Sequence, residues 1–304
     1  MNTPVGRPPL IRQGWLRVLL FFAAFFVILL IIVIPIGSVI ALLNKDAIAR
    51  GEQINVTELL RGQYLWFTVL VSLVVSLLSV FLFRRFIDRK SFRSLGFDWT
   101  GFLKDAGTGF FLAPLILGLG TLILYFSRHL EWMDVDFNGS ELFIGFGIMM
   151  MVAIGEEVVF RGYILNNLME SFGKWIALIV SAVLFTLFHM ANPGINLIPL
   201  LNIFLAGILL GINYIYTKNL WFSILFHLSW NFFQGPLFGY KVSGVNLPSL
   251  LQTELSGDPL LTGAGFGFEG SVIDLAITLV VILSLFLVYE KKYAVKVELS
   301  LRPQ

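Results

Sequence analysis

The chain has 304 residues, of which 57% are hydrophobic and only 13% are charged, and its formal net charge is +2. Soluble globular proteins contain roughly 45–50% apolar and about 25% charged residues, so this composition excludes an ordinary soluble protein and indicates a membrane protein. The absence of cysteine excludes a disulfide framework, a thiolate nucleophile and an iron–sulfur cluster. We expect no nucleic-acid partner.

Eight apolar segments are candidates for membrane-spanning helices, each of which needs about 20 apolar residues. In chain order they are Trp15–Leu43, Tyr64–Phe83, Ala106–Phe126, Glu141–Leu168, Trp175–Met190, Leu197–Tyr216, Leu220–Phe233 and Val272–Tyr289. The fifth and seventh are short, at about 16 and 14 residues, which predicts tilted or partly buried helices. In the sixth, the four-residue spacing of Gly207 and Gly211 permits close contact with a neighbouring helix. We predict an all-α polytopic transmembrane bundle, a single membrane domain over residues 1–304 without a soluble domain.

Lysine and arginine are distributed unequally between the loops on the two sides of the membrane, and this bias predicts the orientation. With the N-terminus inside, the inner segments carry about three times as many basic residues as the outer ones. We expect both termini to be cytoplasmic and the protein to be integral to a bacterial-type cytoplasmic membrane, with membrane lipids as partners. The first apolar run, of about 26 residues, exceeds the roughly 7–15 residues of a signal-peptide core and is interpreted as an uncleaved anchor.

Two glutamates and an arginine, Glu156, Glu157 and Arg161, lie inside the fourth apolar segment. A charged side chain at bilayer depth costs at least about 2.5–3.5 kcal/mol on insertion scales, so three within six residues require an explanation. Glu157 and Arg161 are four residues apart and can pair on one helix face. Glu156 points about 100° away and has no partner nearby in sequence, which suits a general base. The alternatives are a structural Glu157–Arg161 clamp and a Glu156 that merely faces a wet cavity.

Two histidines and an asparagine lie in two further apolar segments. A lone residue such as His189, at the end of the fifth segment, is more often a core histidine than a ligand. His227 and Asn231 are four residues apart in the seventh segment, where they can join helices by hydrogen bonds or donate to an oxyanion. At the α-helical rise, His189 lies about 21 Å and His227 about 10 Å from the inner face. The two therefore meet only if the fifth helix is strongly tilted or begins late.

Three ordered motifs resemble the CPBP family, which contains the type II CAAX-prenyl-protease enzymes and bacteriocin-immunity-type proteins. They are Glu156-Glu157-Val-Val-Phe-Arg161, Phe185-Thr-Leu-Phe-His189 and His227-Leu-Ser-Trp-Asn231. The resemblance covers about residues 140–235, which we expect to be the catalytic core. It implies an all-helical intramembrane endopeptidase that cleaves membrane-associated or lipidated peptide or protein substrates.

The resemblance also implies a role for each motif residue. Glu156 would activate the hydrolytic water, and His189 would help to hold that water. His227 and Asn231 would stabilise the tetrahedral oxyanion. Glu157 and Arg161 would shape and orient the site.

Metal dependence and even enzymatic activity are left open by the residues alone. Glu156, His189 and His227 are a legitimate zinc ligand set, but the His-Glu-x-x-His motif of zinc proteases is absent, so we favour a metal-free site without a cofactor. A proton-coupled membrane transporter would also bury such residues, although no repeat of the polar motif relates the two halves of the chain, as it would in many carriers. A non-catalytic scaffold or immunity partner is the third hypothesis.

Overall fold

The computed structural model describes residues 8–45, 49–50 and 64–301. Its longer helices are α1 (Gly14–Leu43), α4 (Leu65–Leu82), α5 (Leu103–Phe126), α6 (Gly139–Glu157), α8 (Lys174–Phe188), α9 (Leu197–Thr217), α10 (Trp221–Phe232) and α12 (Val272–Leu301). The shorter elements are α7 (Asn166–Leu168), α11 (Pro259–Thr262), the π-helical segments Phe83–Ile87, Val158–Leu165 and Phe233–Leu237, and the 3-10 turns Phe92–Leu95 and Phe268–Gly270. The Lys/Arg bias that predicts the orientation includes three residues that lie outside the described ones: Arg7, Arg61 and Arg302.

The predicted all-α membrane bundle is confirmed, because each predicted apolar segment is helical. Within the described ranges, six helical stretches are long and apolar enough to cross a membrane: Gly14–Ile40, Leu65–Ile87, Leu103–Phe126, Gly139–Leu168, Leu197–Thr217 and Val272–Tyr293. The fifth and seventh predicted segments are the short ones, since α8 has 15 residues and α10 has 12. The chain is therefore an integral membrane protein.

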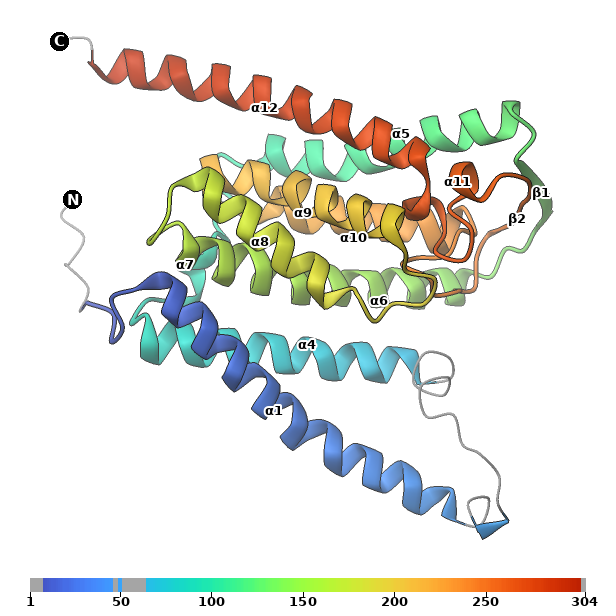
Figure 1. The fold of residues 1–304 in the computed structure, drawn as a ribbon, viewed down its shortest axis with the longest axis horizontal. Helices are drawn as coiled ribbons and strands as arrows, with labels where there is room; N and C mark the ends of the chain where they lie inside the picture. Colours follow the sequence, from blue (N-terminus) through green and yellow to red (C-terminus); the bar gives the residue numbers. More distant parts are fainter. Residues whose placement is uncertain (1–7, 46–48, 51–63, 302–304) are drawn as a thin grey trace.

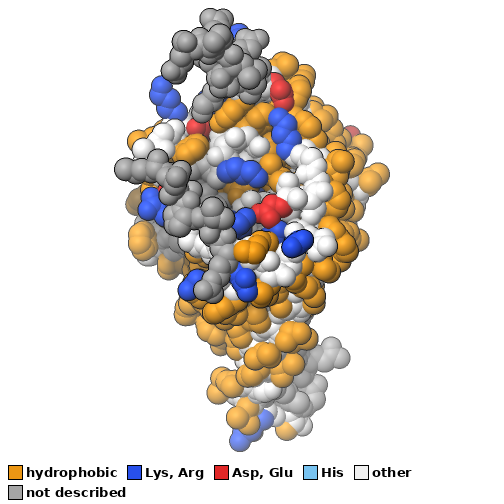
Figure 2. Space-filling model, turned by 90° about the vertical axis from the view of Figure 1, so that its left-hand side faces the viewer, with side chains coloured by type: hydrophobic (Ala, Val, Ile, Leu, Met, Phe, Trp, Pro, Cys, Tyr) orange, Lys and Arg blue, Asp and Glu red, His pale blue; other side chains and the backbone are white. Residues whose placement is uncertain are grey.

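The helices form a layered bundle with both termini at the same end (Figure 1). α5 and α12 lie on one side, α8, α9 and α10 occupy the middle, and α6, α4 and α1 follow on the other side. Helix α10 packs against α5 and α6, α9 packs against α8 and α12, and α4 packs against α6 and α1. Lysine and arginine side chains gather on the end that carries the termini (Figure 2).

At this end, five charged side chains form a continuous network. Arg17 of α1 donates to Asp88 at 3.0 Å and also to Glu170. Arg84 donates to the other oxygen of Asp88 at 2.9 Å, and Lys90 donates to Glu170 at 2.6 Å. Burial opposes ionisation of Glu170, but the hydrogen bonds from Lys90 and Arg17 hold its pKa below the ordinary value. The network fastens α1 to the segments that follow α4 and α7.

Two short strands were not predicted from the sequence. β1 (Leu130–Val135) pairs antiparallel with β2 (Leu251–Leu255) at the end of the bundle opposite the termini (Figure 1). In β1 only the first residue is buried, so this strand lacks the alternation by which a strand is predicted from sequence. The ribbon links the loop before α6 to the long segment between α10 and α12.

The predicted close helix contact at the two glycines of α9 is confirmed. A Cβ added to Gly207 would lie 2.9 Å from the Cα of Ala182 in α8, and one added to Gly211 would lie 2.4 Å from a methyl of Leu178. The backbones of α8 and α9 can approach each other closely here because glycine carries no side chain. This contact sets the distance between α8 and the helix beside it.

We expect Gly207→Ala to destabilise the protein by about 1–3 kcal/mol, because the added methyl overpacks a backbone contact that cannot yield. The measurement is the thermal unfolding midpoint in detergent. Gly118→Ala is the matched control, since a Cβ on Gly118 of α5 meets nothing within 4 Å, and alanine favours a helix over glycine. Equal midpoints for the two variants would contradict the close contact.

Candidate active site

Glu156 and Glu157 end α6, and the chain continues directly into the π-helical segment Val158–Leu165. The two neighbouring carboxylates face different surroundings. The Glu157 side chain is 0% exposed inside the protein, whereas the Glu156 side chain is 32% exposed and lines a cavity. Adjacent positions on a helix point about 100° apart, so the structure separates the two acids as the sequence predicts.

The predicted pair of Glu157 and Arg161 is present. Nη1 of Arg161 donates to Oε1 of Glu157 at 2.8 Å, and Nη2 donates to the backbone oxygen of Gly207 at 3.1 Å. The guanidinium also stacks over the ring of Phe185, 4.5 Å from its centroid. Arg161 is therefore fixed by three elements at once, and its buried charge is both paired and hydrogen-bonded.

Glu157 has a second partner that the sequence did not predict. Its Oε1 lies 2.8 Å from Nδ1 of His227, on α10. Because the carboxylate accepts, Nδ1 carries the proton, and Nε2 of His227 is turned toward Glu156, 4.0 Å from its Oε2. Residues 70 positions apart in the chain leave no periodic signal, so only the packing of α10 on α6 reveals this contact.

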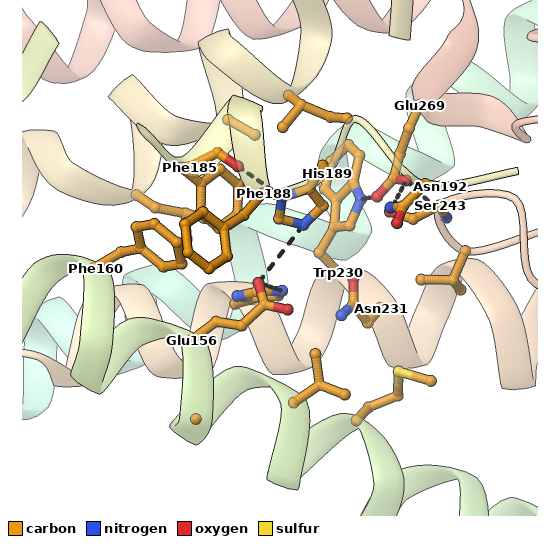
Figure 3. A pocket seen from close by; sticks show the side chains of 18 of the residues that line it. Glu156, Phe160, Phe185, Phe188, His189, Asn192, Trp230, Asn231, Ser243 and Glu269 are labelled. Carbon is orange, nitrogen blue, oxygen red and sulfur yellow. Dashed lines mark hydrogen bonds and ion pairs between the residues drawn. The ribbon is translucent and has the colours of Figure 1, made fainter. Parts of the chain in front are cut away.

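His189 approaches the same oxygen of Glu156 from another helix. It caps the end of α8, where its Nδ1 hydrogen-bonds the backbone oxygen of Phe185 at 2.8 Å. Its Nε2 lies 3.7 Å from Oε2 of Glu156, the pair drawn in Figure 3. The difference in depth between the histidines is resolved because α8 is inclined across α9 and α10 (Figure 1).

The six predicted site residues therefore converge around one point. Glu156, His189, His227 and Asn231 line a cavity of about 410 Å³, and Glu157 and Arg161 support it from inside the protein. Asn231 is 5% exposed, and Figure 3 shows it beside Glu156, below Trp230 in that view. The remaining lining is mostly aromatic and aliphatic, with the polar side chains of Ser72, Ser76 and Asn192 among it.

Glu269 is a residue of this cavity that the sequence analysis did not identify. The structure places Glu269 on the wall of the same cavity. It accepts hydrogen bonds from Nε1 of Trp230 at 2.9 Å and from the backbone and hydroxyl of Ser243, both at 3.0 Å (Figure 3). The tryptophan in the His227–Asn231 motif is therefore held by a residue close to α12.

The residue types around Glu156 are those of a zinc site, but the distances between their ligand atoms are longer than such a site requires. Both imidazoles have Nδ1 engaged, which leaves Nε2 for a metal or a proton. The separations of 3.7 and 4.0 Å from Oε2 of Glu156 exceed the about 3.4 Å between two ligands of tetrahedral zinc. Within the described ranges, no group of three or more His, Cys, Asp or Glu side chains is arranged to hold a metal ion.

The fold and the site define a class of protein: a helical membrane protein with a buried glutamate–histidine centre that opens into a cavity. Residues 138–233 match the family described as Rce1-like, type II CAAX prenyl endopeptidase Rce1-like. The chain thus carries a domain of this family, and the resemblance to the CPBP proteins is confirmed. This assignment implies a membrane endopeptidase. Searches of curated proteins and of solved structures returned no match.

We expect Arg161→Met to destabilise the protein by about 3–5 kcal/mol, because the change removes one partner of a buried ion pair and leaves Glu157 with His227 alone. The double variant Glu157→Gln with Arg161→Met should regain much of this loss, since the stranded charge is gone. The measurement is a double-mutant cycle on thermal stability in detergent.

Glu156→Gln combined with Arg161→Met is the control cycle. It should show little coupling, because Glu156 faces the cavity and does not contact the guanidinium. A larger coupling of Arg161 to Glu156 than to Glu157 would reverse the two roles.

Proposed function

We propose that the protein is an intramembrane endopeptidase in which Glu156 activates water and the reaction needs no metal. The observation that carries the proposal is the convergence of two imidazole Nε2 atoms, 3.7 and 4.0 Å away, on one carboxylate oxygen of Glu156. That oxygen accepts no hydrogen bond from the described side chains. A water molecule held there would lie between a base and two imidazoles.

His189 and Glu156 would hold the nucleophilic water between them. The hydrogen bond to Phe185 keeps the proton of His189 on Nδ1, so its Nε2 accepts a hydrogen bond. Water can then donate one hydrogen to His189 and the other to Glu156. As the oxygen attacks the peptide carbonyl carbon, Glu156 takes the proton, and it later delivers this proton to the amide nitrogen as the C–N bond breaks.

His227 and Asn231 would stabilise the negative charge that develops on the carbonyl oxygen. Nδ1 of His227 donates to the carboxylate of Glu157, so with a second proton on Nε2 the imidazole would be a donor toward the cavity. The amide of Asn231 supplies a second donor on the same face of α10. Donors fixed in a site that excludes water stabilise an oxyanion far more than donors in solution do.

A zinc-dependent form of the same protease is the second candidate, and the orientation of both Nε2 atoms toward Glu156 favours it. Glu156, His189 and His227 would hold the ion, which would lower the pKa of a bound water molecule. A proton-coupled transporter has less support, since the residue constellation is accounted for by the family of residues 138–233.

The substrate that this site suits is a membrane-associated or lipidated peptide or protein. The apolar cavity wall accepts hydrophobic chains, and surrounding lipids would be the other partners of the protein. We place the protein in a bacterial-type cytoplasmic membrane, with both termini on the cytoplasmic side. The basic end of the bundle in Figure 2 supports this orientation.

Glu156→Gln should lower the rate of peptide cleavage by at least about 10²-fold while leaving the protein folded, because it removes the base at nearly constant shape. The measurement is cleavage of membrane-anchored peptides in proteoliposomes, read by mass spectrometry. Glu141→Gln, an exposed acid in the first turn of the same helix, is the control and should keep full activity. Wild-type turnover by Glu156→Gln would exclude Glu156 as the base.

Exhaustive chelation should leave cleavage intact if no metal takes part. Elemental analysis of the active preparation should then find zinc well below stoichiometric amounts. Loss of activity on chelation, followed by recovery with zinc alone, would favour the zinc-dependent candidate.

A further inference from the structure

The cavity has a second polar end that the proposed reaction does not use. Its residues are Asn202 of α9, Glu269 of the Phe268–Gly270 turn and Asp274 of α12, and all three line the same cavity as Glu156. In Figure 3 the indole of Trp230 lies between His189 and the carboxylate of Glu269. The two polar ends therefore lie on either side of one side chain of α10.

Asn202 presents a buried acceptor at this end. Its Nδ2 donates to the backbone oxygens of Glu269 at 2.7 Å and Ser271 at 2.8 Å. Because both neighbours are carbonyl oxygens, the amide cannot be flipped, and the remaining atom must be Oδ1. This oxygen has no hydrogen-bond partner, and the residue is only 3% exposed. Leaving a buried acceptor without a donor is unfavourable, so a ligand that donates a hydrogen bond here would relieve that cost.

The two carboxylates beside Asn202 have no cationic partner. In the part of the chain that the structure describes, neither Glu269 nor Asp274 forms an ion pair. Asp274 is 4% exposed and accepts from the hydroxyl of Thr278 at 3.1 Å. It lies in the first turn of α12. The second end of the cavity thus combines hydrogen-bond acceptors with two carboxyl groups that have no cationic partner among the described residues.

We propose that Asn202, Glu269 and Asp274 form a subsite that binds the cationic side chain, lysine or arginine, of a residue next to the cleaved bond. An ammonium or guanidinium group supplies the positive charge that the two carboxyl groups lack and an N–H donor for Oδ1 of Asn202. The cavity continues from Glu156 to this end, so one extended peptide can reach both. The inference deepens the proposed function by naming a substrate class, and it rests on that function.

The test uses apolar membrane-anchored peptides that carry either lysine or norleucine at one position, scanned along the chain. At one position we expect kcat/KM for lysine to exceed that for norleucine by about tenfold or more. Asp274→Asn should reduce this ratio by about tenfold, because asparagine keeps the shape and cannot become negatively charged when the cation binds. Asp136→Asn, an exposed acid outside the cavity, is the matched control and should keep the ratio. Equal cleavage of both peptides by the wild type would overturn the subsite.

Binding of the same peptides to Glu156→Gln separates this inference from the proposed function. If the wild type cleaves nothing, the protease proposal fails. Tighter binding of the lysine peptide to Glu156→Gln, lost when Asp274→Asn is added, would still support the subsite. No preference in binding would overturn it. Stabilisation by Na⁺ or Ca²⁺ alone that excludes the lysine peptide and depends on Asp274 would also overturn it, in favour of an inorganic cation site.

Discussion

The carboxylate of Glu157 is fully buried, and the arrangement of the site depends on how its charge is compensated. An unpaired buried carboxylate would cost several kcal/mol, so the partners of Glu157 cannot be removed without a structural response. Arg161 and His227 both bind its Oε1, and Arg161 continues to the backbone of α9 at Gly207. One buried charge therefore joins α6, α9 and α10.

This compensation engages Glu157 inside the protein and leaves Glu156 to face the cavity. Two glutamates in sequence would repel each other if both faced one pocket. The helix turns them apart, so one acid is neutralised inside the protein and the other lies at the cavity with two imidazoles nearby. The π-helical segment that begins directly after them brings Arg161 back beneath Glu157, and such segments often occur at functional sites.

The features of this site that could be predicted from the sequence are those that depend on the spacing of residues within one helix. The Glu157–Arg161 pair follows from a four-residue interval on one helix, and the close contact at Gly207 follows from the spacing of two small residues. The Glu157–His227 contact joins distant helices, and no periodicity encodes it. The same holds for the link from Trp230 to Glu269, which depends on where the chain returns after the β1–β2 ribbon. Helices parallel to the membrane normal would have placed His189 and His227 at different depths. The two histidines meet because α8 is inclined, and this inclination is set by packing and cannot be derived from helix length.

The charged network at Arg17 fixes α1 to the rest of the protein at one end. Near this end Phe21 is 0% exposed, whereas further along the same helix Ile31 is 66% exposed to its surroundings. Figure 1 shows α1 diverging from the bundle as it leaves the network. Phe25, near the start of the divergence, lines the cavity. The far part of α1 therefore borders on lipid, so a sideways displacement of that part breaks few protein contacts and leaves the ionic anchor intact. The part of the cavity wall at Phe25 thus belongs to a helix that is held at one end only.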